Sequence, residues 1–86
     1  MFSQKYLLKE NLNESSNSLK IYKNKDGAYD AIQSFKLYSF MWNSEKSKIY
    51  NFKKLGGIDK NYAINGKLVS KPPMQMILQI QENIKK

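Results

Sequence analysis

Fifteen lysines supply the positive charge of this chain of 86 residues, which contains no arginine and has a net charge of +8. A lysine ammonium attracts phosphate as a point charge, whereas bidentate readout of guanine needs arginine. Residues 46–71 hold seven lysines against Asp59 alone, and residues 1–45 hold six against five acids. A codon bias toward lysine would spread the charge more evenly. We therefore expect a site for nucleic acid or an acidic protein surface, with little sequence preference, at Lys46, Lys48, Lys53, Lys54, Lys60, Lys67 and Lys71.

Five aromatic residues share the segment that leads into these lysines. Exposed rings beside lysines could stack on the bases of single-stranded nucleic acid, at about 1–3 kcal/mol per base. The same rings could instead fill the core, and no other predicted strand pair offers comparable apolar area. We favour the core and keep the stacking platform as the alternative. The five residues are Tyr38, Phe40, Trp42, Tyr50 and Phe52.

Catalytic and metal-binding chemistry finds little support in the composition. The chain has no cysteine and no histidine, so it lacks disulfides, thiolate ligands and the commonest general base at neutral pH. Its seven carboxylates are scattered, and Gly56-Gly57 lacks the motif of a phosphate-binding loop. We expect no metal, no cofactor and no enzymatic activity.

The hydropathy pattern shows no run near the roughly 18 apolar residues of a membrane span, and the first residues lack a signal-peptide profile. We therefore expect a soluble, cytoplasmic protein without a membrane partner. The host would be bacterial or archaeal if the chain comes from a phage.

The aromatic segment itself predicts a hairpin. Residues 38, 40 and 42 alternate with less bulky neighbours, as do residues 50 and 52, and the polar stretch 43–47 fits a connecting loop. A five-residue loop would pair Trp42 with Lys48, Phe40 with Tyr50 and Tyr38 with Phe52. All five rings would then share one face, which makes this register the favoured one.

The segments before the hairpin predict one helix and one further strand pair. Ala28, Ala31, Ile32 and Phe35 have helical spacing, and Asn24 would be the N-cap of a helix over 24–35. Residues 5–8 and 19–22 predict a second hairpin around the loop 13–18. A helix over 3–12, with Ser3 as its N-cap, is the alternative for the first of these runs.

The segments after the hairpin combine turn signals with a C-terminal helix. Gly56-Gly57 should end the second strand of the hairpin, and Asn65-Gly66 suits a type I′ turn between short strands at 61–64 and 67–70, or the tip of a flexible finger. Residues 74–84 alternate like a strand but also form a broad apolar arc on a helix. Pro73 before them and Lys85-Lys86 after them favour the helix. Its apolar arc could pack on the sheet or form a homodimer seam through Met74, Ile77, Leu78 and Ile84.

These elements predict one small α+β domain over 1–86: an antiparallel sheet of about four or five strands with two helices on one face. The function we expect first is a non-catalytic basic module that binds nucleic acid through the lysines of 46–71. The alternatives are a small inhibitor of a host nucleic-acid-processing protein, like the anti-CRISPR proteins of phages and mobile elements, and a homo-oligomeric structural protein.

Overall fold

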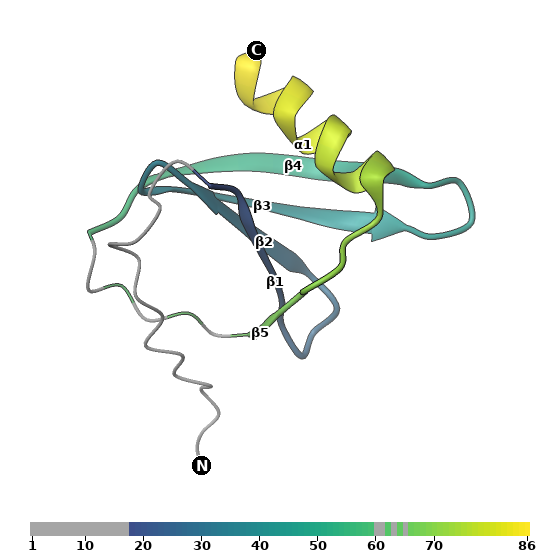
Figure 1. Ribbon diagram of the computed structural model, residues 1–86, viewed down its shortest axis with the longest axis horizontal. Coiled ribbons are helices and arrows are strands. Elements are labelled where there is room, and N and C mark those ends of the chain that lie inside the picture. Colours follow the sequence, from purple (N-terminus) through teal and green to yellow (C-terminus); the bar gives the residue numbers. More distant parts are fainter. Residues whose placement is uncertain (1–17, 60–61, 63, 65) are drawn as a thin grey trace.

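The computed structural model describes residues 18–59, 62, 64 and 66–86, and these residues form five antiparallel strands and one helix. The strands lie in one sheet in the order β4-β3-β2-β1-β5, and the helix crosses one face of it above β3 and β4 (Figure 1). The α+β class and the antiparallel sheet are therefore confirmed. The elements are β1 (Lys20–Lys23), β2 (Tyr29–Gln33), β3 (Lys36–Asn43), β4 (Lys48–Gly57), β5 (Lys67–Leu68) and α1 (Met74–Lys85).

The helix predicted over 24–35 is wrong, because this segment forms the β1–β2 loop, β2 and the following turn. Asn24 accepts backbone N–H groups as a cap would, but its Oδ1 bonds Asp26 N (3.0 Å) and Ala28 N (3.1 Å) within the loop. β2 is the central strand and is buried on both faces, where Ala31 and Ile32 are 0% and 4% exposed. A strand that is buried on both faces does not alternate between apolar and polar residues. The apolar residues of this segment therefore also matched the spacing of a helix.

Two hydrophobic clusters cover the two faces of the sheet. On the face under α1, called the helix face, the buried residues are Ile21, Ala31, Tyr38, Phe40, Met76 and Ile80. On the opposite face, called the far face, the buried residues are Tyr22, Ile32 and Ile64, with Leu37 and Ile58 packed against them. The segment after β4 therefore covers β1 and β2 on the far face, while α1 covers β3 and β4 on the helix face.

The β3–β4 hairpin is confirmed as an element, but its predicted register is wrong. Asn43 pairs with Lys48, so four residues form the turn instead of five, and Asn43 Oδ1 accepts the Lys46 N–H at 3.0 Å. Met41 consequently faces Tyr50 and Trp42 faces Ile49. A bulge at Asn51, whose φ is 55°, then returns Phe52 to the helix face. Tyr50 is thus left on the far face, away from the other four rings.

The C-terminal helix is confirmed as α1, which begins directly after Pro73. Its buried stripe is narrower than the predicted arc: Met76 and Ile80 are buried, and Ile77 and Ile84 pack against the core. Met74 and Leu78 are 65% and 52% exposed. No helix of the described chain is long and apolar enough to cross a membrane.

The remaining connections differ from the predicted strand pairs. β4 runs through Gly56 to Gly57 instead of ending before them. Lys67 and Leu68 pair with β1, at Lys23 and Tyr22, and the described residues of the predicted partner segment, Tyr62 and Ile64, belong to no strand. The runs 5–8 and 3–12 and the turn residue Asn65 lie outside the described residues.

Candidate nucleic-acid interface

The structure divides the predicted lysines between the two edges of the sheet. Lys48, Lys53 and Lys54 belong to the edge strand β4, and Lys46 lies in the turn before it. Lys67 lies in β5 at the opposite edge, and Lys71 lies in the connection to α1. Lys60 lies outside the described residues. The six predicted lysines that the structure describes therefore do not form one continuous surface.

The far face of β4 brings an aromatic ring between two of these lysines. Lys48 pairs with Asn43, Tyr50 with Met41 and Lys53 with Ser39, so the three β4 side chains share one face. Tyr50 is 47% exposed, and both lysines are exposed. Their cross-strand partners are all uncharged. We call Lys48, Tyr50 and Lys53 the β4 surface.

The other predicted stacking residues are used by the core. Tyr38 and Phe40 are 6% and 1% exposed, and Trp42 and Phe52 pack against the same cluster. Tyr38 stacks on Phe52 with ring centroids 5.6 Å apart, and Phe40 stacks on Tyr29 at 5.2 Å. Among the five predicted rings, Tyr50 is thus the one that is largely exposed to solvent.

Lys54 belongs to the helix face, opposite its neighbour Lys53. It pairs with Tyr38, and its Nζ donates to the carbonyl of Ile84 at 3.4 Å, near the C-terminal end of α1. A cation near a helix C-terminus is favourable because the last carbonyls carry partial negative charge. This contact gives Lys54 a structural role, unlike Lys48 and Lys53.

One acidic side chain lies on the far face near the β4 surface. Asp30 shares a cross-strand row with Ser39 and Lys53. Burial raises the pKa of the Asp30 carboxyl above its ordinary value. Burial and, to a smaller extent, the negative charge of Asp30 raise the pKa of Tyr62, which places that ring close to the carboxylate. Asp30 is therefore partly withdrawn from solvent, while the lysines extend into it.

A second basic group surrounds the β1–β2 loop. Lys23, Lys25 and Lys67 line, together with Asn24, an open pocket of about 280 Å³. Lys23 and Lys67 are direct cross-strand partners. Gly66 permits this approach, because a Cβ at that position would lie 3.0 Å from the Lys23 carbonyl oxygen. Sequence reasoning found Lys67 but missed Lys23 and Lys25, which belong to the half of the chain where acids balance lysines. We call this group the lysine pocket.

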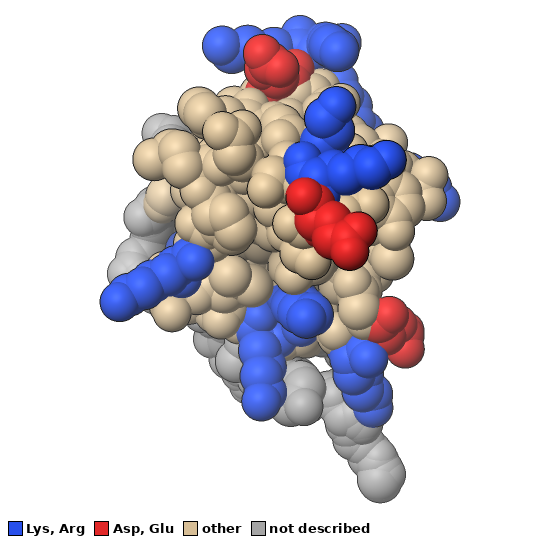
Figure 2. Space-filling model, turned by 90° about the vertical axis from the view of Figure 1, so that its right-hand side faces the viewer, with Lys and Arg blue, Asp and Glu red and all other residues tan. Residues whose placement is uncertain are grey.

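The two basic groups lie toward the same end of the sheet. In an antiparallel sheet, the β1–β2 loop and the β3–β4 turn project from one end, and the β2–β3 turn projects from the other. Figure 2 shows the side from which the β3–β4 turn projects. Lysine side chains extend there as separate groups around an uncharged surface, with acidic side chains at a few places.

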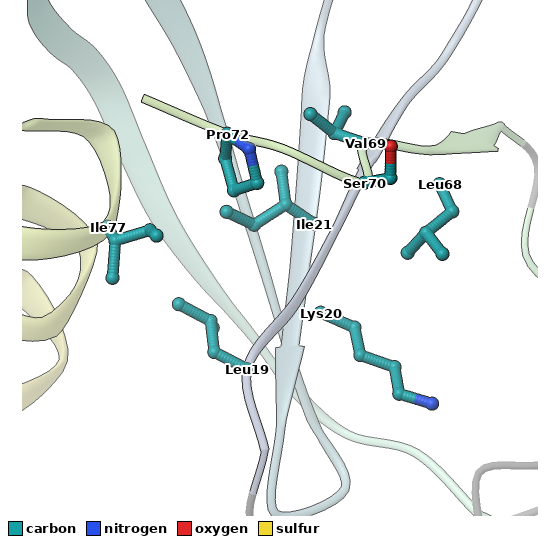
Figure 3. Close-up of a pocket in the computed structure, with 8 residues that line it drawn as sticks. All are labelled: Leu19, Lys20, Ile21, Leu68, Val69, Ser70, Pro72 and Ile77. Carbon is teal, nitrogen blue, oxygen red and sulfur yellow. The ribbon is translucent and has the colours of Figure 1, made fainter. Parts of the chain in front are cut away.

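An apolar pocket lies at the other edge of the sheet, between β1, the β5–α1 connection and the start of α1. Its volume is about 430 Å³, and Leu19, Ile21, Val69, Pro72 and Ile77 form most of its wall. Figure 3 shows the Lys20 ammonium pointing away from these side chains. Ligand sites usually combine apolar walls with a few convergent polar groups. Apart from Lys20, the only polar side chain among the lining residues is that of Ser70, so the pocket does not offer several convergent polar groups and we do not include it in the candidate interface.

Neither the arrangement of acidic side chains nor comparison with known proteins identifies a further site or a family. Within the described ranges, no three Asp or Glu side chains lie together as a metal site would require. The chain matches no protein-family model, no curated protein and no solved structure. The candidate interface therefore rests on its own geometry.

Proposed function

We propose that this protein is a non-catalytic module that binds nucleic acid with little sequence preference through the β4 surface and the adjacent Lys46. The observation that carries the proposal is the exposed Tyr50 ring between two exposed lysines on one face of β4. Aromatic rings that stack on bases, next to cations that contact the backbone, are the common means of binding single strands.

The placement of Tyr50 supports this function more than the lysine count alone does. An exposed tyrosine on an edge strand contributes nothing to the core, whereas the other four rings of the hairpin all pack there. Lysines on edge strands also discourage strand pairing between molecules, so they do not indicate a ligand by themselves. The Tyr50 ring adds to these cations the second feature of a surface that binds single strands, which is an aromatic group on which a base can stack.

The proposal predicts binding that weakens steeply with salt. Each phosphate contact on a single strand contributes roughly −0.7 to the slope of log K against log salt, so three lysines predict a slope of about −2. Fluorescence anisotropy of a labelled oligo(dT), measured between low and raised sodium chloride, gives this slope. Absence of binding at low salt would contradict the function.

Matched variants separate the β4 surface from general charge. Lys48→Ala and Lys53→Ala should each weaken binding and reduce the slope by about 0.7. Lys36→Ala is the control, because it removes the same charge from an exposed strand residue beside the β2–β3 turn. Tyr50→Ala should weaken binding about 5- to 150-fold through loss of one stack. Leu55→Ala is its control, since Leu55 is an exposed apolar residue of the same strand.

The exposed side chains of α1 favour a second candidate, which is a protein-binding function. Met74 and Leu78 are one helical turn apart and together present an apolar stripe away from the core. The other two residues of the predicted dimer seam, Ile77 and Ile84, pack against the core instead. A partner of α1 would therefore contact a smaller stripe than the sequence indicated.

A further inference from the structure

The lysine pocket contains charges that repel one another. Lys23 and Lys67 lie directly opposite on adjacent strands, and Lys25 lines the same pocket. Like charges in directly opposite positions destabilise a sheet. No ion pair joins these three lysines to an acid within the residues that the structure describes, although Asp26 belongs to the same loop. The sheet therefore maintains an unfavourable arrangement at this point.

Part of the cost for Lys23 is offset by an aromatic ring. Its Nζ lies 5.7 Å from the centroid of Tyr29, a cation–π contact. The contact places the Lys23 ammonium beside the Tyr29 ring. Lys25 and Lys67 have no comparable contact among the described residues.

Asn24 adds a neutral donor whose orientation is set by the loop. Its Oδ1 accepts two backbone N–H groups, from Asp26 and Ala28, so the plane of the amide is fixed. The Nδ2 group has no acceptor among the described residues, and Asn24 is one of the residues that line the pocket. Three lysines from two strands and a loop, together with Asn24, thus line one open pocket of about 280 Å³.

We propose that the lysine pocket binds a phosphate group that carries about two negative charges, either within a free polyphosphate or at the end of a nucleic acid. Such a group offers several strong acceptor oxygens, which suits ammonium and amide donors that approach from different elements. Its charge also removes the repulsion between Lys23 and Lys67. This site is separate from the β4 surface and does not depend on the proposed function.

Thermal unfolding with inorganic tripolyphosphate tests the free form of the ligand. The midpoint of the wild-type chain should rise more with tripolyphosphate than with sodium chloride at equal ionic strength, because a ligand that binds only the folded state stabilises it. Lys67→Gln should weaken the apparent affinity at least about tenfold, and Asn24→Asp should do the same while keeping an oxygen to hold the loop. Lys36→Gln is the matched control and should respond like the wild type.

Two oligonucleotides that differ in one group test the other source. A 5′-phosphorylated strand should bind more tightly than the same strand with a 5′-hydroxyl, and Lys67→Gln should abolish the difference. A response in either experiment that Lys67→Gln removes supports the site and identifies its source. If neither ligand exceeds its control, or if Lys67→Gln responds like Lys36→Gln, the inference is overturned.

The unliganded variants provide an independent measurement. At low ionic strength and without phosphate, Lys67→Gln should raise the thermal midpoint, since it removes the like-charge pair. A fall in the midpoint relative to Lys36→Gln would show that the lysines do not repel one another in the folded chain. That result would remove the basis of the inference.

Discussion

At the scale of single residues, Asn51 decides which side chains of β4 face the core. It has a φ of 55°, in the left-handed region that asparagine tolerates better than most residues. The resulting bulge lets Tyr50 face one way and Phe52 the other, although they are two residues apart. The sequence suggested strict alternation because a bulge leaves no periodic signal and one asparagine within a strand is a weak indication.

Substitutions at Asn51 test this bulge. Asn51→Val should lower the free energy of unfolding by about 1–2 kcal/mol, because a β-branched residue is strained at positive φ. Asn51→Gly should remain within about 0.5 kcal/mol of the wild type, since glycine adopts this conformation readily. Urea unfolding of both variants gives the comparison. Equal stability of the two variants would argue for the regular register with all five rings on one face.

At the scale of elements, Gln79 of α1 links the helix to the start of β4. Its side-chain amide bonds backbone groups there, as a neighbouring strand would. Gln79 Nε2 donates to the carbonyl of Ser47 at 2.8 Å, and its Oε1 accepts the Ile49 N–H at 2.9 Å. β4 is the edge of the sheet, so these two backbone groups have no strand beside them. The side-chain amide therefore forms hydrogen bonds with backbone groups at the start of β4 that could otherwise pair with a strand of another chain.

Removal of the amide should cost stability at this edge. Gln79→Leu should lower the free energy of unfolding by about 1–2 kcal/mol, because it leaves two backbone groups without their partners. Gln75→Leu is the matched control in the same helix, at an exposed position. Urea unfolding gives the difference between the variants, and identical midpoints would show that water replaces the amide at no cost.

The helix α1 was predictable from the sequence, whereas the central strand β2 was not. α1 was predicted within a residue or so of its ends, because its buried stripe, Pro73 and its terminal lysines all agree. β2 was mistaken for a helix because it is covered on both faces. The β4 surface was partly predictable: its lysines and Tyr50 were all named, but their common face depended on the turn length. Lys23 joined the site through pairing with β5, 44 residues later, which no local pattern reveals.

At the scale of the whole molecule, the positive charge is dispersed instead of concentrated. The predicted lysines lie on both edges of the sheet, and the lysine pocket and the β4 surface present separate groups toward one end. Lysines that are spread over the molecule can contact a long polyanion at several places, whereas a compact anion would contact only one group of them. Charge alone would not have separated these two groups.

The small apolar stripe on α1 predicts that the chain does not form a homodimer through it. Two exposed side chains supply only part of the roughly 800 Å² that each partner buries in a stable interface. Sedimentation at high concentration should therefore give the monomer mass of 10.1 kDa. A dimer that Met74→Lys and Leu78→Lys both dissociate would contradict this and favour the protein-binding candidate.

The brevity of β5 has a consequence for the order in which the fold opens. β5 is held to β1 by two residue pairs and by the Val69 N–H bond to the Ile21 carbonyl, at 2.8 Å. A segment that makes few contacts with the rest of the fold opens easily. The amide hydrogens of β5 should therefore exchange with solvent sooner than those of β2 and β3. Lys67 belongs to this segment, so detachment of β5 takes the lysine pocket apart. An anion that contacts both Lys23 and Lys67 would therefore join β5 to β1 and slow amide exchange in β5, so ligand binding and the opening of this edge of the sheet would be coupled.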